Sequence, residues 1–146
     1  MMRRVGDFMC TLALAGEAAV LLTVAHALTR RVTYRRWSRL LGTAGGVGGA
    51  IAADADRVRA ARVGRIIDRV ADRHPWRPVC LPRAMCGRWM LNRRGVANTM
   101  FVGVEPEARA GAKRMLHAWL VVSGVTVKGR ITDRDIRPIA RFGDAE

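Results

Sequence analysis

The sequence predicts an α+β fold, in which helices come first and a small antiparallel sheet follows. Three observations support this prediction. Residues 6–31 and 55–73 have the apolar patterns of helices, residues 96–143 contain short β-type runs separated by turn signals, and the two kinds of element are segregated along the chain. Strands that alternated with helices would instead indicate a doubly wound parallel sheet.

Residues 6–31 form the first predicted helix, which is apolar and ends in the cationic run "LTRR". The start "MMRR" and the later "AHA" also resemble a signal peptide, and the apolar length resembles a short membrane span. Glu17 lies at the centre, however, and a charged residue at mid-span costs about 3 kcal/mol. We therefore favour a helix packed on the domain or on a partner over membrane contact of residues 6–31.

Two further helices surround a glycine-rich break. The run "YRRWSRLLG" at 34–42 predicts a short helix, and "GTAGGVGGA" at 42–50 follows it as a flexible segment. Residues 55–73 have apolar residues at helical spacing, and His74 before a proline ends that helix. We divide the chain into an N-terminal helical segment with a glycine-rich linker, residues 1–54, and a core, residues 55–146.

The stretch "PVCLPRAMCGRWMLNRRG" at 78–95 predicts a helix over 81–94 that is closed by Gly95. Pro82 suits the first turn, where the missing amide hydrogen has no helical partner to lose. Cys80 is thus predicted at the N-cap or beside it. We interpret His74 as a helix stop and Trp76 as a core residue, in preference to walls of a substrate cleft.

The second half of the chain has the period of strands. Gly124 and Ser123 form a turn signal between two β-type runs, which predicts a hairpin. The predicted strands cover 96–105, 117–122, 125–130 and 136–143, and 107–115 is a polar connection.

Basic residues dominate the charge. The chain has 26 lysine and arginine residues against 12 acidic ones, which gives a formal net charge of +14. This balance suggests an anionic partner: nucleic acid, a membrane surface, or an acidic protein or peptide. Aromatic residues make up only 5% of the chain, which argues against stacking on single-stranded nucleic acid, and we expect no nucleic-acid partner.

The three cysteines, at 10, 80 and 86, form neither a disulfide framework nor a CxxC pair. A reduced, cytoplasmic setting fits this usage. The histidines at 26, 74 and 117 do not stand at zinc-finger spacing from the cysteines. We therefore expect no metal and no cofactor.

Cys80 and His117 are the candidates for catalysis. A helix N-terminus carries partial positive charge and free amide hydrogens, which favour thiolate and can hold an oxyanion. A thiolate nucleophile needs an acid–base partner, and His117 opens a strand 37 residues later. Taken alone, each residue is more often structural. Cys86, six residues further along the helix, is predicted to be core, and Cys10 has no motif around it.

The runs "CLPRAM…MLNRRG", "MFVGV" and "LHAW" surround and connect Cys80 and His117. They resemble motifs of the lasso-peptide leader peptidases, which are small transglutaminase-like cysteine peptidases. Here "CLPRAM…MLNRRG", "MFVGV" and "LHAW" stand in the order of that family's "CLxRA…LRRRG", "LVIGV" and "AHAW". The segment "YRRWSRLLG" is similar to the family's "PFRRWARLLG", and "IARFG" near the end is also similar. The resemblance implies a transglutaminase-like or papain-like core, with a nucleophile-bearing helix packed on the sheet.

The resemblance also implies roles for single residues. Cys80 matches the nucleophile, and His117 matches the general base and acid. The family's third member is an aspartate about a dozen residues after the histidine, and that position is near Gly129 here. A simple hairpin would place about Arg130 opposite His117. The nearest acids are Asp133, which could orient the imidazole if the strand bulges, and Asp135; a water or a backbone carbonyl would be the alternative.

The implied function is removal of the leader peptide from a ribosomally made lasso-peptide precursor through a thioester. The expected partners are the precursor peptide, a separate leader-recognition protein and an ATP-dependent lasso cyclase. Two alternatives stay open: a non-catalytic scaffold or basic binding module, and an acyl transferase of the same superfamily.

Overall fold

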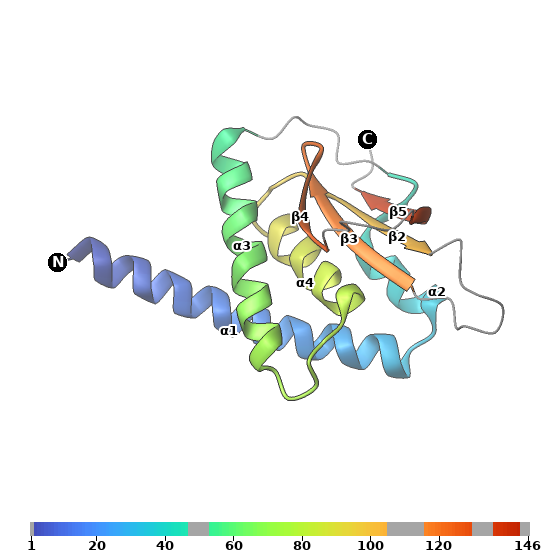
Figure 1. The fold of residues 1–146 in the computed structure, drawn as a ribbon, viewed down its shortest axis with the longest axis horizontal. Coiled ribbons are helices and arrows are strands. Elements are labelled where there is room, and N and C mark those ends of the chain that lie inside the picture. Colours follow the sequence, from blue (N-terminus) through green and yellow to red (C-terminus); the bar gives the residue numbers. More distant parts are fainter. Residues whose placement is uncertain (1, 47–52, 105–115, 130–135, 144–146) are drawn as a thin grey trace.

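The computed structural model describes residues 2–46, 53–104, 116–129 and 136–143, and their side chains from residue 6 onward. The helices are α1 (Met2–Arg31), α2 (Tyr34–Trp37), the 3₁₀ turn η1 (Ser38–Leu41), α3 (Asp54–Arg73) and α4 (Cys80–Asn92). The strands are β1 (Thr43–Ala44), β2 (Thr99–Val104), β3 (Leu116–Val122), β4 (Val125–Lys128) and β5 (Arg137–Gly143). Apart from the two-residue strand β1, the helices precede the strands of the antiparallel sheet, and the α+β prediction is confirmed (Figure 1).

The sheet has the strand order β1-β5-β2-β3-β4, and each of its pairings is antiparallel. The predicted hairpin of β3 and β4 is confirmed, and its turn residues Ser123 and Gly124 both have positive φ. One expectation is wrong in part. The glycine-rich break includes β1, where Thr43 and Ala44 pair with Gly143 and Phe142. Residues 47–52 and the predicted connection 107–115 lie outside the described residues.

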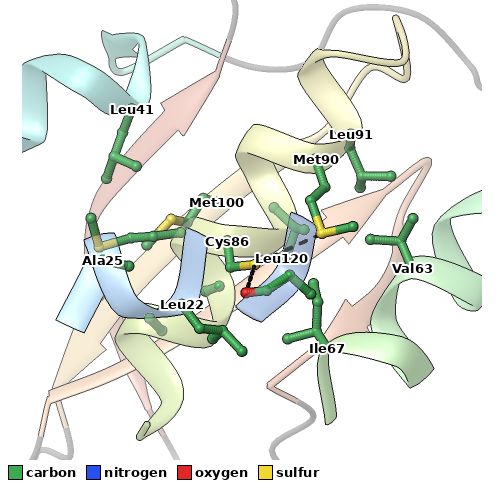
Figure 2. Packing of buried hydrophobic residues seen from close by; sticks show 14 of the residues in the cluster. Leu22, Ala25, Leu41, Val63, Ile67, Cys86, Met90, Leu91, Met100 and Leu120 are labelled. Carbon is green, nitrogen blue, oxygen red and sulfur yellow. Dashed lines mark hydrogen bonds between the residues drawn. The ribbon is translucent and has the colours of Figure 1, made fainter. Parts of the chain in front are cut away.

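One hydrophobic core joins the helices to the sheet. Cys86 of α4 lies at its centre, and its thiol faces the Ala18 carbonyl of α1 and the Met90 sulfur (Figure 2). Side chains from α1, α3, η1 and the strands surround it; the buried ones include Leu22, Leu41, Ile67, Met100 and Leu120. The N-terminal segment and the rest of the chain therefore bury their apolar faces against each other.

Arg88 and Trp89 of α4 bind the end of the run "YRRWSRLLG" through its backbone. This arginine of α4 is fully buried, and its guanidinium donates to the backbone carbonyls of Leu41 and Asn98 and to the side chain of Asn98. Trp89 next to it donates to the Leu40 carbonyl at 3.0 Å. These bonds satisfy the carbonyls where η1 ends, and they tie α4 to η1 and to the start of β2.

Glu17 ties the middle of α1 to the end of α4. Its carboxylate accepts hydrogen bonds from Arg94 at 2.5 and 3.2 Å and lies 3.6 Å from Arg93. The Glu17 side chain is only 16% exposed. Residues Gly6–Arg31 are long and apolar enough to cross a membrane by length and composition, and this ion pair shows why a charge stands at their centre. The predicted packing of α1 on the domain is confirmed for this part of the helix.

Glu17→Gln is expected to destabilise the protein by about 1–2 kcal/mol at pH 7. The hydrogen bond from Arg94 holds the pKa of Glu17 below its ordinary value of 4.5. The stabilisation is therefore complete above that pH and is lost as pH falls through the folded-state pKa. Urea unfolding at pH 7 and pH 3 measures it, and the gap between wild type and variant should narrow at pH 3. Asp54→Asn, at a fully exposed carboxylate, is the control and should change stability by at most about 0.5 kcal/mol. An equal effect of both variants would contradict the argument.

Candidate active site

Cys80 is the first residue of α4, and Val79 stands at the N-cap with extended backbone. Of the two predicted positions for Cys80, the N-cap or the residue beside it, the structure has the second, because Cys80 directly follows the N-cap residue. Pro82 occupies the first turn as predicted. The free amides and positive end of the α4 dipole lie at this end of the helix, and both favour an anionic sulfur.

The fold brings Cys80 to the start of β3. The Cys80 thiol lies 3.5 Å from the carbonyl oxygen of Leu116, whose peptide bond leads directly into His117. Both Cys80 and His117 line one open pocket of about 530 Å³. Two residues far apart in the sequence therefore meet at one surface hollow.

One ring nitrogen of His117 has no hydrogen-bond partner among the described residues. This nitrogen is Nε2, and it is buried. The described interactions include no hydrogen bond between the imidazole and the Cys80 thiol, which instead faces Leu116. Catalytic hydrogen bonds often tighten only when substrate binds, so this arrangement is compatible with an acid–base role.

A charged wall, which sequence analysis missed, completes the pocket. Asp68 of α3 pairs with Arg83 of α4 at 3.0 Å and with Lys128 of β4, and Arg83 also binds Asp72 at 2.9 Å. Lys128 is 8% exposed, so its ammonium is held in the protein by Asp68. Three elements contribute these residues, and no local motif marks them in the sequence.

Gly129 explains why the expected acid is missing. Its φ of +75° is left-handed, and a Cβ built there would overlap the Ala118 carbonyl and lie 3.0 Å from the Trp119 Cα. The backbone thus fills the space where an aspartate side chain would begin. A side chain at position 129 is excluded by this close approach.

The hairpin register differs from the simple one. Leu120 pairs with Lys128 while Val121 pairs with Thr126, so Val127 is an extra residue in a bulge. A hairpin without a bulge would pair Leu120 with Val127. The predicted pairing of β3 with β4 is therefore displaced by one residue from Leu120 onward. Arg130, Asp133 and Asp135 lie outside the described residues.

The prediction that Trp76 is a core residue is wrong, because its side chain is 56% exposed. Its ring stacks on His26 of α1 at 5.7 Å between centroids and lies 4.8 Å from the His74 ring. His74 does end α3 as predicted, and its Nε2 lies 3.0 Å from the Thr23 hydroxyl. This cluster fastens the segment before Cys80 to α1. Trp119 of β3 stacks on Phe101 of β2, with 5.4 Å between the ring centroids.

The chain carries the sequence pattern of the transglutaminase-like superfamily over residues 20–141. It belongs to the transglutaminase-like superfamily. This superfamily includes cysteine peptidases and acyltransferases, and its match covers both Cys80 and His117. Neither the curated proteins nor the solved structures returned a match to the chain.

The three cysteines of this transglutaminase-like protein should differ in reactivity. Burial raises the pKa of the Cys86 thiol to about 12, and its side chain is fully buried, as predicted for a core residue. We expect iodoacetamide at pH 7 to modify Cys80 at least about tenfold faster than exposed Cys10, because cysteines at helix N-termini are often the reactive ones. Cys86 should react only after unfolding. Peptide mapping by mass spectrometry gives the three rates, and equal rates for Cys80 and Cys10 would contradict an activated thiol.

Proposed function

We propose that this protein is a cysteine peptidase that removes the leader peptide from a lasso-peptide precursor. One observation carries the proposal: the helix-start thiol of Cys80 lies against the peptide bond that precedes His117, and both residues open into one pocket. Membership of the transglutaminase-like superfamily and the ordered motifs around both residues support it.

The chemistry proceeds through a thioester. The Cys80 thiolate attacks the last leader carbonyl, and the amides at the start of α4 stabilise the oxyanion. His117 donates a proton to the leaving amine of the core peptide as the C–N bond breaks. It then takes a proton from water as the water attacks the thioester. The leader is released as a carboxylic acid that ionises, and the Cys80 thiolate and the protonated His117 are restored.

The partners follow from the same proposal. A separate leader-recognition protein delivers the precursor, and an ATP-dependent cyclase closes the ring of the freed core in the cytoplasm. On α1, Leu14, Ala18, Leu22 and Ala25 are buried, whereas Phe8, Leu12, Val20 and Val24 are exposed on the opposite face. This second apolar face, with the arginine-rich residues 30–39 at its end, supports docking of a protein partner.

The direct test combines the chain, a leader-recognition protein and a precursor, and follows leader release by mass spectrometry. Leader and core should appear with a free carboxylate and a free amine at the cleaved bond. Adding a primary amine tests acyl transfer, because a transferase would yield the leader amide. The absence of both products with every component present would favour the scaffold alternative.

Asp133→Ala is expected to lower kcat of leader release by about 10- to 100-fold, with a smaller change in KM. We propose that this carboxylate orients His117, and an orienting acid acts on the transition state more than on binding. Asp135→Ala is the matched control, and steady-state kinetics separates the two. An unchanged kcat in the Asp133 variant would assign the role to another group.

A further inference from the structure

A second pocket lies between α3 and β4, beside the one that holds Cys80. It has a volume of about 460 Å³. Gly64 of α3 forms one side, and Val125 and Val127 of β4 form the other. The pocket exists in this shape because α3 approaches the β4 bulge at Gly64, where a Cβ would lie 2.7 Å from the Val127 carbonyl oxygen.

The two pockets adjoin at Asp68, which lines both. The carboxylate of Asp68 is paired with Arg83 and Lys128, so it adds no unbalanced negative charge at the junction. A peptide held in the Cys80 pocket can therefore continue past Asp68 into the pocket between α3 and β4. We call the two adjoining pockets together the α3–β4 groove.

The rim of the α3–β4 groove is cationic. Arg57 and Arg65 of α3 line it. Arg65 is exposed, and no carboxylate among the described residues pairs with it. Arg57 has only a long contact, 3.9 Å, with the fully exposed Asp54. The two guanidinium groups are thus available to an anionic ligand, and arginine binds carboxylates with two parallel hydrogen bonds.

The spacing suits an extended chain. At a helical rise of about 1.5 Å per residue, Arg65 lies about 4.5 Å along α3 from Asp68, and Arg57 about 16 Å. An extended peptide advances about 3.3 Å per residue. One to two peptide residues therefore separate Asp68 from Arg65, and about five separate it from Arg57.

We propose that the α3–β4 groove is a subsite for acidic side chains of the peptide substrate. The substrate carries aspartate or glutamate about one to two residues, and about five residues, beyond the point where it passes Asp68 on leaving the Cys80 pocket. This inference rests on the proposed function, and it locates the acidic partner that the net charge of +14 only suggests.

The test measures binding without chemistry. Fluorescence anisotropy follows a labelled peptide of about twelve alternating Glu and Ala residues, or its Gln counterpart, on the full-length Cys80→Ala protein. The Glu peptide should bind about tenfold more tightly at low salt, and sodium chloride should reduce the difference. Arg57→Gln/Arg65→Gln should bring the two peptides within about twofold of each other. Arg69→Gln removes an exposed arginine of the same helix outside the groove and should keep the preference.

Three results would overturn the groove proposal: equal binding of the Glu and Gln peptides, an equal loss in the Arg69 variant, or stronger competition by a thymidine oligonucleotide than by the Glu peptide. The binding and cleavage experiments can contradict the groove proposal and the peptidase proposal independently of each other. If the wild-type protein does not cleave a precursor but the Glu preference depends on Arg57 and Arg65, the groove stands and the peptidase function falls. If it cleaves and no preference appears, only the groove proposal falls.

Discussion

Cys80→Ala is expected to abolish leader release, lowering kcat/KM by at least about 10³-fold. The variant removes the sulfur that forms the thioester, and no other described thiol lines the pocket: Cys86 is buried in the core and Cys10 is exposed elsewhere. The measurement is the rate of precursor cleavage with the leader-recognition protein present. A trapped thioester in the wild type, visible as a mass increase equal to the leader acyl group, would identify the bond directly.

His117→Ala should have a similar effect, because leaving-amine protonation and water activation both use the same imidazole. The double variant should be no slower than either single variant, since residues that act as one unit are not additive. Cys10→Ala is the matched control and should retain full activity. Substantial cleavage by either the Cys80 or the His117 variant would remove that residue from the mechanism.

Gly129→Asp is expected to destabilise the protein by about 3 kcal/mol or more and to give no gain in activity. The substitution places an acid at the position where the resemblance expects one. The left-handed backbone and the close Ala118 carbonyl leave no room for its Cβ, so β3 and β4 must separate. Thermal unfolding and cleavage kinetics of the same preparation measure both effects.

Gly124→Asp isolates the cost of the backbone conformation. Gly124 has a similar φ of +76°, but a Cβ there would meet nothing within 4 Å. Aspartate tolerates this conformation in turns, so the loss should stay near 1 kcal/mol. If the two aspartate variants lose the same stability, steric overlap at Gly129 is not the cause. If Gly129→Asp raises kcat, the hairpin has room for an orienting acid at that position.

Local patterns in the chain predicted much of the fold. The helix over 55–73 ends at His74 because the next residue is proline, and the hairpin turns at Ser123–Gly124 because glycine accepts the positive φ that the turn needs. Such signals act between near neighbours, and sequence records them directly. The prediction that Cys80 lies at the N-cap of the helix over 81–94 or beside it has the same origin, since Pro82 suits a first turn.

The sequence by itself determined the order of the elements, the helix-start position of Cys80 and the strand position of His117. Only the tertiary structure decided that Cys80 lies against Leu116, that Asp68 and Lys128 close the same pocket, and that Gly129 leaves no space for an acid. The physical reason is the separation along the chain of the residues that interact. Turn and helix signals depend on a few adjacent residues, whereas the bulge at Val127 and the approach of α3 at Gly64 depend on packing between distant elements.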